Sequence, residues 1–450
     1  MSVLSSSANQ GNESSKPLIP THTRTPSWAG SEGRRARDGQ SGQFFWSRII
    51  TVLLILGGCL MFGGSPTPSP TASVNVRTMV SSSDACAARL SFPKIALMFL
   101  IKGPLHHSEM WESWLEGAAG VVPAEFLGDQ ICEDEGASPA DIVDACSRSR
   151  QHLFSVYLHV SAELDVDELL EPQWSLHAKN ISRVVTWWGH NSLVEATRYL
   201  LARAFEDPAN ERFVLLSETH IPIWDPLTVY RVAMNQRRSS INAYYHDDMN
   251  WNRWTEKMLP VIPLNHWRKS QQWWTLIRSH AELVLLDSDV FEVFRQQCVM
   301  EFDFQNYRHR KCFSDEHFFA TLLSIKGVED ETIPFFATTT YVDWSEGGAH
   351  PKSFLAEELT SDLLTNKLRS HKDCPLSPID QRMLVKSASS SFIDIGELQS
   401  SNRERICDTS KSHGRFSKTA MPDSCATFAR KFNEDTVDAV YSLLSEATVL

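Results

Sequence analysis

The sequence lacks the short motifs that identify the most recognisable enzyme classes. It has no P-loop, no Gly-x-Ser-x-Gly, no His-Glu-x-x-His and no glycine-rich dinucleotide fingerprint, which excludes the classes that those motifs define. It also lacks an excess of basic residues, since the formal net charge is -12 at pH 7. An acidic chain argues against nucleic acid as the main partner.

Long apolar runs are also scarce, and only one is a candidate for crossing a membrane. Ile49 to Phe62 is fourteen residues long without a charge, shorter than the roughly 20 apolar residues of an average span. A buried helix and a signal-peptide core are the alternatives. A cleaved signal would not normally start 48 residues into a chain, and the Ser/Pro-rich stretch from Ser65 to Pro70 cannot belong to a packed core. We therefore predict a signal anchor.

The predicted anchor divides the 450 residues into four parts. The first 48 residues hold six basic and three acidic residues, and the positive side of a span stays in the cytosol. We expect a cytosolic disordered tail (1–48), a signal-anchor transmembrane helix (49–64), a Ser/Thr/Pro-rich stem (65–91) and a lumenal domain (92–450). The chain would then be a single-pass type II membrane protein.

Cysteine and glycosylation signals agree with a lumenal body. Eight of the nine cysteines follow the apolar run, and an even lumenal number permits disulfides, although scattered buried thiols are the alternative. Cys298 and Cys312 flank a polar loop, and we predict a disulfide between them. Asn180 begins an Asn-Ile-Ser acceptor site for N-glycosylation.

Continuous apolar runs predict an α/β fold with a mostly parallel central sheet. Lys94 to Ile101, Leu153 to Val160 and Phe213 to Ser217 have the pattern of strands buried on both faces, with Arg183 to Thr186 as a shorter candidate. A helix is expected to open on the capping box at Ser192 and to separate two of these strands. Such sheets bind ligands beyond the carboxyl ends of their strands, so we expect the loops after Ile101, Val160 and Ser217 to surround the active site.

Acidic residues offer two kinds of chemistry. Asp165 and Asp167, like Asp287 and Asp289, are spaced two apart and could hold a divalent cation against a diphosphate, although solvated loops are the simpler interpretation. Glu316 follows Ser314 just before an apolar helix. In one interpretation Ser314 is the N-cap of that helix and Glu316 compensates the helix dipole. In the other, Glu316 is a general base at the mouth of a pocket.

Tryptophans and cations cluster where sugar rings could stack. The candidate sugar or acceptor contacts, for which core packing is the alternative, are Arg253, Trp254, Trp267, Arg268 and Trp344. Near the C-terminus, two adjacent cations stand between aromatic residues in Phe-Ala-Arg-Lys-Phe, so one of them could face a phosphate.

Taken in order, several segments resemble the core-2/I-branching β-1,6-N-acetylglucosaminyltransferase family, in its plant and algal branch. The matching segments are KIALMFLIKGPL, VYLHV, ANERFVLLSETHIPI, WRKSQQWW, SDEHFFATLL, TYVDWSEGGAHP and FARKF. The resemblance implies a Golgi type II enzyme with a GT-A-like nucleotide-sugar fold that inverts the donor anomer without a metal. It also implies that Glu316 is the catalytic base and that Lys431 holds the donor diphosphate, with Arg405 and Arg415 as candidates for a second cation.

The sequence therefore predicts a Golgi glycosyltransferase that moves a sugar, N-acetylglucosamine being one candidate, from a UDP-sugar to a glycan hydroxyl. Single displacement at an anomeric carbon needs a base and positive charge on the leaving group, and Glu316 and Lys431 can supply them. A metal-dependent transferase using Asp165 and Asp167 is one alternative. A membrane-anchored glycan-binding protein without turnover is the other.

Overall fold

The computed structural model describes residues 92–119, 121–123, 152–244, 253–303, 308–333, 338–348, 350–369, 392–394 and 426–450. All of them belong to one unit, Arg77–Leu450. The predicted tail, signal anchor and stem lie outside the described residues. No helix among the described residues has both the length and the apolar character that a membrane span requires.

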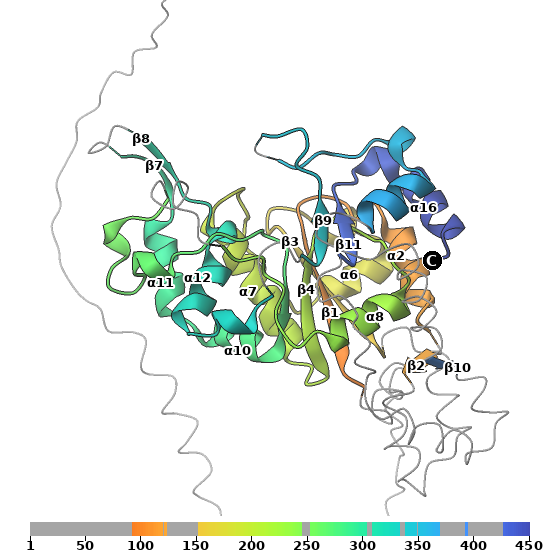
Figure 1. Cartoon of the computed structure of the whole chain (residues 1–450), viewed down its shortest axis with the longest axis horizontal. Helices are drawn as coiled ribbons and strands as arrows, with labels where there is room; N and C mark the ends of the chain where they lie inside the picture. Colours follow the sequence, from red (N-terminus) through yellow and green to blue (C-terminus); the bar gives the residue numbers. More distant parts are fainter. Residues whose placement is uncertain are drawn as a thin grey trace, which may run out of the picture. The chain divides into compact units, whose positions relative to one another are not determined.

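A four-stranded sheet lies at the centre of this unit (Figure 1). Its strands, in spatial order, are β3 (Phe154–Val160), β1 (Lys94–Ile101), β4 (Asn210–Leu216) and β6 (Thr275–Ile277). β1 is parallel to both of its neighbours, and β6 is antiparallel to β4. The three predicted buried strands are confirmed, and the mixed α/β architecture with a largely parallel sheet fits a GT-A-like fold.

Both faces of the sheet are buried because each strand is apolar on both sides. Along β1, Leu97 and Phe99 belong to one hydrophobic cluster, whereas Ala96 and Met98 belong to the other, as expected when successive side chains point to opposite faces. Burying one such Leu or Phe side chain contributes roughly 1.5–3 kcal/mol. Because the run is apolar at successive positions and not at alternate ones, this segment forms a strand that is buried on both faces.

Helices cover the two faces in separate groups (Figure 1). Residues of the first cluster come from α2 (Ser108–Glu116), α6 (Pro172–Ala178), α8 (Pro226–Asn235) and α16 (Val437–Glu446). Residues of the second come from α7 (Asn191–Phe205), α10 (Arg278–Leu286), α11 (Asp289–Gln297) and α12 (Phe318–Ile325).

Two local predictions near α7 are wrong. The helix is capped by His190, whose Nδ1 accepts the backbone N–H of Ser192 at 3.1 Å, so Ser192 does not open a capping box. Arg183 to Thr186 is not a strand. Instead, the Arg183 guanidinium donates to the carbonyls of Val160 and Ser161 at the end of β3, and the backbone N–H of Thr186 donates to the Ser161 hydroxyl.

A second sheet brings the C-terminal segment to the carboxyl ends of the central strands. It has the order β5 (Ile221–Pro222), β11 (Phe428–Arg430) and β9 (Thr340–Val342). β11 is parallel to β9 and antiparallel to β5. Arg430 and Lys431 are therefore carried to the loop that follows β4, more than 200 residues earlier in the sequence. Elsewhere β2 (Val121–Pro123) pairs with β10 (Phe392–Asp394).

A disulfide closes the hairpin of β7 (Met300–Asp303) and β8 (Arg308–Lys311). It joins Cys298, at the end of α11, to Cys312, with their Cα atoms 5.0 Å apart and both side chains buried. The predicted disulfide is confirmed. The remaining cysteines lie outside the described residues.

Candidate active site

A cavity of about 1,070 Å³ lies next to the second sheet. Its walls come from the segments around Gly189, Lys269, Glu316, Trp344 and Arg430. The loops after Ile101, Val160 and Ser217, which we expected to surround the site, are not among its lining residues. The cavity is instead built from segments later in the sequence, which the second sheet and the turn before α12 bring together.

Glu316 stands in the wall of this cavity with one carboxylate oxygen held by two cations. It ends the short helical turn η3 (Ser314–Glu316), directly before α12. Its Oε2 accepts Nη1 of Arg253 at 2.5 Å and Nζ of Lys269 at 2.8 Å. No described residue donates a hydrogen bond to Oε1, which leaves that oxygen for a ligand in the cavity. Arg253 and Lys269 come from separate loops, so the tertiary fold brings both cations to Glu316.

The structural interpretation of this turn as a capped helix start is not supported. Among the described residues, none hydrogen-bonds to the buried Ser314 hydroxyl. The N-cap positions of η3 and α12 are Phe313 and His317, and neither side chain makes a capping bond. The prediction of an N-cap at Ser314 is therefore wrong. The side chain of Glu316 is committed to cations in the cavity instead.

The two neighbouring carboxyl groups are driven toward opposite protonation states. Burial alone would raise the pKa of Glu316, but Lys269 and Arg253 outweigh it and hold that pKa below its ordinary value. Burial and the charge of Glu316 raise the pKa of Asp315 to about 7. Oδ1 of Asp315 is buried and has no hydrogen-bond partner in the part of the chain that the structure describes. Pairs of titratable groups separated in this way assign acid and base roles. Glu316 is the ionised member and thus the candidate base.

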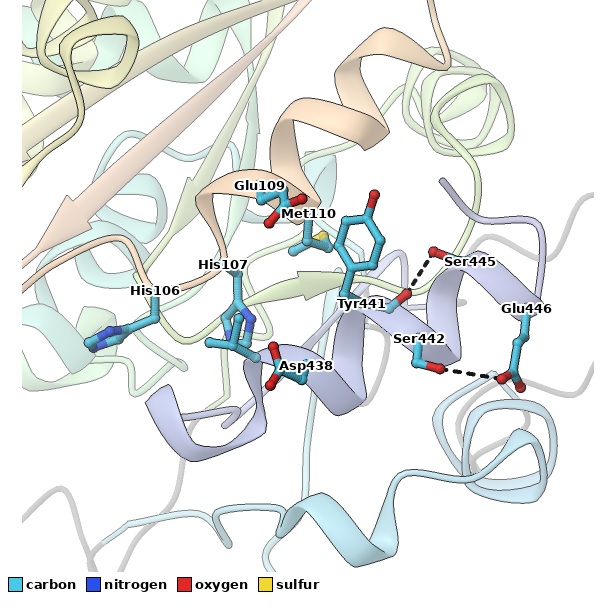
Figure 2. A pocket seen from close by; sticks show the side chains of 10 residues that line it. His106, His107, Glu109, Met110, Asp438, Tyr441, Ser442, Ser445 and Glu446 are labelled. Atoms are coloured by element: carbon cyan, nitrogen blue, oxygen red, sulfur yellow. Dashed lines mark hydrogen bonds between the residues drawn. The ribbon is translucent and has the colours of Figure 1, made fainter.

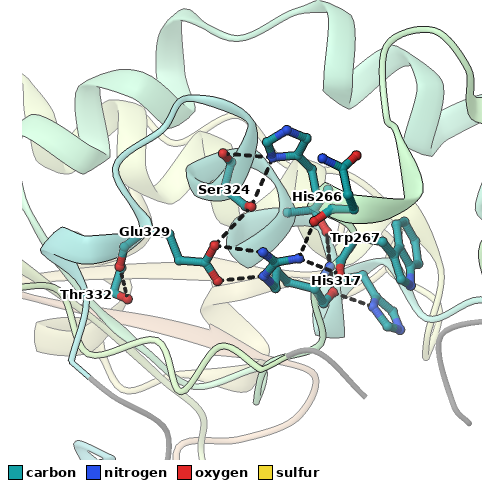
Figure 3. Close-up of polar contacts among 9 residues, drawn as sticks. His266, Trp267, His317, Ser324, Glu329 and Thr332 are labelled. Atoms are coloured by element: carbon teal, nitrogen blue, oxygen red, sulfur yellow. Dashed lines mark hydrogen bonds and ion pairs between the residues drawn. The ribbon is translucent and has the colours of Figure 1, made fainter. Parts of the chain in front are cut away.

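His317, the residue after Glu316, belongs to a buried network of contacts with the segment around Trp267 (Figure 3). Burial lowers the pKa of His317 to about 3, and its Nδ1 donates to the carbonyl of Arg268 at 2.6 Å. Trp267 is fully buried, with its ring stacked on that of His317 at 4.5 Å. Because no ligand can reach Trp267, its prediction as a sugar contact is corrected to a supporting role.

Of three further predicted sugar contacts, one lines the cavity and two lie outside its lining. Arg268 does not line the cavity. Its guanidinium is paired with the Glu329 carboxylate, with Nε 2.6 Å from Oε1 and Nη2 2.9 Å from Oε2. Trp254 does not line it either, since its indole N–H donates to the carbonyl of Ile262. Trp344 lines the cavity and keeps 49% of its surface exposed, so it can contact a ligand directly.

Arg430, which the sequence interpretation did not choose, is the C-terminal cation that faces the cavity. It lines the same space as Glu316, with its guanidinium 4.7 Å from the centre of the Trp273 ring. Lys431 does not line that space. Burial and the charges of Arg430 and Lys102 lower the pKa of Lys431. The adjacency of Arg and Lys was the sequence signal for Arg430.

A second cavity, of about 500 Å³, is lined by α2, the loop before it and α16 (Figure 2). His107 lines it and is buried, and burial lowers the pKa of its imidazole to about 4. The neutral ring donates from Nε2 to the carbonyl of Phe432 at 3.3 Å. His107 thus anchors the segment directly after Lys431, and the cavity is separate from the one that contains Glu316.

In each acidic pair considered for metal binding, the first carboxylate has a structural role. Asp165 caps α5 (Val166–Leu169) by accepting the backbone N–H groups of Asp167 and Glu168. Asp287 accepts the backbone N–H of Phe291 at 3.0 Å. Among the described residues, no three His, Cys, Asp or Glu side chains gather in a way that could hold a metal ion.

The predicted glycosylation site is described by the structure, whereas the candidates for a second phosphate-binding cation are not. Asn180 is exposed and has a positive φ of 61°, so an attached glycan would meet solvent there. Arg405 and Arg415, the candidates for a second phosphate-binding cation, lie outside the described residues.

Comparison with known proteins identifies the family. Residues 139–367, just over half of the chain, match the model of the Core-2/I-Branching enzyme family. The chain belongs to that family. It is also 29% identical over 315 residues, covering 65% of this chain and 70% of the relative, to "Glycosyltransferase BC10" of Oryza sativa subsp. japonica. This Core-2/I-branching protein is accordingly a glycosyltransferase, and its similarity to a rice protein supports the plant branch of the family. Glu316 lies within the matched region, whereas Lys431 lies beyond it.

Proposed function

We propose that this protein is an inverting glycosyltransferase that transfers a sugar from a UDP-sugar to a glycan hydroxyl without a bound metal. N-acetylglucosamine is the sugar that the resemblance suggests. The observation that carries the proposal is the position of Glu316, which faces a large cavity while Arg253 and Lys269 hold its Oε2. This geometry supports an ionised base with one oxygen available for an acceptor.

Glu316 would remove the proton from the attacking hydroxyl group of the acceptor. The acceptor oxygen forms a bond to the anomeric carbon while the bond from that carbon to the diphosphate oxygen breaks, and the proton passes to Oε1 of Glu316. Because the substitution is a single displacement from the opposite side, the anomeric configuration inverts. The two cations on Oε2 keep Glu316 ionised at neutral pH, when it must act.

Fixed cations would receive the negative charge of the leaving diphosphate. Arg430 faces the cavity, and its Nε has no hydrogen-bond partner among the described residues. Lys431 is the next residue, and the charge of Lys102 also acts on its ammonium group. Arginine and lysine bind phosphate by charge-assisted hydrogen bonds, which can replace a divalent cation in stabilising the leaving group.

Specific contacts count against the two alternatives, a metal-dependent transferase and a glycan-binding protein without turnover. A metal-dependent transferase would require the Asp165 carboxylate, which already caps α5. A glycan-binding protein without turnover would have no need of a carboxylate held ionised beside a cationic group. Both alternatives make distinct predictions for metal removal and for donor hydrolysis.

We also propose a Golgi membrane location with the body in the lumen. The positively charged tail before the apolar run supports this orientation, and the Cys298–Cys312 disulfide suits an oxidising compartment. Protease treatment of sealed microsomes should spare the body and remove the tail. Digestion of the body in intact microsomes would contradict the orientation.

The proposed activity is tested by incubating the full chain with a panel of UDP-sugars and measuring release of UDP. We expect one donor to be hydrolysed above background in the presence of EDTA. Absence of hydrolysis with every UDP-sugar, with the protein folded, would favour the glycan-binding alternative. Hydrolysis only after manganese is added would favour the metal-dependent one.

A further inference from the structure

The turn that follows β4 contains a buried histidine that the proposed mechanism does not use. His220 has no exposed surface, and its Nδ1 accepts the backbone N–H of Ser217 at 2.9 Å. The Ser217 hydroxyl lies 2.8 Å from the same nitrogen. Because Nδ1 is the acceptor, the proton of the neutral ring is on Nε2, which has no hydrogen-bond partner among the described residues. The turn thus fixes both the tautomer and the place of this ring.

His220 packs against the tryptophan on which Arg430 lies. The ring centres of His220 and Trp273 are 4.6 Å apart, and the ring planes make an angle of 72°, which is an edge-to-face contact. The guanidinium of Arg430 lies 4.7 Å from the centre of the same Trp273 ring, which is a cation–π contact. Trp273 and Arg430 both line the cavity that contains Glu316, whereas His220 does not. His220 therefore contacts the wall of the cavity through Trp273.

The guanidinium of Arg430 has fewer polar partners than the other cations of the cavity. The other Arg and Lys side chains that line the cavity each form an ion pair with a carboxylate, and they are Arg253, Lys269 and Lys367. Among the described residues, no carboxylate forms an ion pair with Arg430, and its Nε has no hydrogen-bond partner. Strand β11 fixes the backbone of Arg430, so the direction of its guanidinium depends on packing against the Trp273 ring.

The imidazole of His220 is neutral, which matters because a cation lies close to it. Burial and the charge of Arg430 hold the pKa of His220 well below its ordinary value. Burial also lowers the pKa of Arg430 to about 10, although the charge of Glu218 opposes this effect. Arg430 thus keeps its charge at neutral pH, and the His220 ring supports Trp273 without repelling that charge.

The same turn is bonded to the C-terminal segment through the backbone. The N–H of Phe432 donates to the carbonyl of Thr219 at 3.1 Å. Strand β5, which begins at Ile221, pairs with β11. The turn therefore places the backbone on either side of Lys431, while His220 acts on the side chain of Arg430.

We propose that His220 is a positioning residue, which holds the Arg430 guanidinium through Trp273 in the direction that receives the diphosphate of the donor. The inference rests on the proposed function, in which Arg430 faces the leaving diphosphate. It adds a residue that touches neither the substrates nor the reacting atoms. Two features of His220 are separable, because Nδ1 holds the turn whereas the ring supports Trp273.

The test separates the ring of His220 from its hydrogen bond. His220→Asn keeps an acceptor for the Ser217 N–H and loses the ring, whereas His220→Phe keeps a ring and loses the acceptor. UDP and uridine are titrated into the full chain by calorimetry, and thermal unfolding is followed by circular dichroism. We expect His220→Asn to bind UDP about tenfold more weakly, the lower end of the effect of losing one charge-assisted hydrogen bond. Its affinity for uridine and its unfolding temperature should stay close to those of the wild type. His220→Phe should unfold at a lower temperature and retain the wild-type affinity for UDP.

A double-mutant cycle shows whether His220 acts through Arg430. In a chain that carries Arg430→Ala, His220→Asn should cause no further loss of UDP affinity. His280→Asn is the matched control, because His280 is buried, its Nδ1 lies 2.7 Å from the Ser239 hydroxyl, and it does not line the cavity. The control variant should bind UDP as the wild type does.

Three results would overturn the positioning role. They are wild-type UDP affinity in a folded His220→Asn variant, equal losses of affinity for UDP and for uridine, and an undiminished further loss in the Arg430→Ala chain. Weakened UDP binding by a folded His220→Phe variant would also overturn it, which keeps the test decisive if His220→Asn does not fold. A wild type that binds no UDP would instead contradict the proposed function, so the two failures are distinguished.

Discussion

Replacing Lys269 with Met should make Glu316 a base that functions only at higher pH. Lys269 donates to Oε2 of Glu316 at 2.8 Å, and its side chain is only 13% exposed. Methionine retains most of the apolar stem and removes the charge. Arg253 would then hold the carboxylate alone, while the burial that disfavours its charged form remains.

The size of the effect follows from the lost charge-assisted hydrogen bond. Such a bond contributes about 1.5–3 kcal/mol, so Glu316 should bind a proton roughly ten- to a hundredfold more tightly in the variant. In the wild type the pKa of Glu316 is lowered, so the ionised carboxylate stabilises the fold at neutral pH, and this contribution is lost as the pH falls through the folded pKa. In Lys269→Met the pKa rises, and the loss of both activity and stability begins at higher pH.

The assay is the pH dependence of kcat/KM, which reports the ionisation of groups in the free enzyme. The acid limb of the profile should move to higher pH in Lys269→Met. Lys326→Met is the matched control, since Lys326 lies 3.8 Å from Asp287 and outside the cavity. An acid limb that is unchanged in Lys269→Met, or that moves equally in the control, would refute the assignment of Glu316 as the base.

Three further predictions concern stability and the leaving group. Replacing both Cys298 and Cys312 with Ala should lower the free energy of unfolding by about 3 kcal/mol, as expected for a closed loop of about 15 residues, and equal stability in urea would contradict this. The pKa of Asp315 is raised to about 7, so the stability that its protonated carboxyl contributes is lost as the pH rises from about 4 to 7. Asp315→Asn should remove this component of the pH dependence, and an unchanged slope in denaturation at several pH values would contradict the assignment. Lys431→Ala should weaken UDP binding measured by calorimetry, whereas EDTA and Asp165→Ala should leave turnover nearly unchanged; full inhibition by EDTA reversed by manganese would count against fixed cations.

The central strands could be predicted because their signal is local. Lys94 to Ile101 is apolar throughout, and only a strand with both faces covered buries such a run. Arg183 to Thr186 shows where the same reasoning fails. Its backbone and side-chain donors are satisfied by the end of β3, a set of partners that is absent from the local sequence.

The site was only partly predictable because its contacts join distant segments. Glu316 could be chosen from the resemblance, but its pairing with Lys269 depends on how the loops before β6 fold. The exposed fraction of each tryptophan likewise depends on the tertiary fold. Trp267 is fully buried and Trp344 is 49% exposed, although each stands between two polar residues in the sequence.

The central claim, that Glu316 is the base of a sugar transfer, is tested most directly by Glu316→Gln. The amide can still accept hydrogen bonds from Arg253 and Lys269, but it cannot take a proton at neutral pH. We expect transfer from the active UDP-sugar to fall by about 10²–10⁴-fold, while UDP binding measured by calorimetry and the thermal unfolding temperature stay close to those of the wild type. Transfer within a few-fold of the wild type, in a folded variant that binds UDP, would contradict the claim.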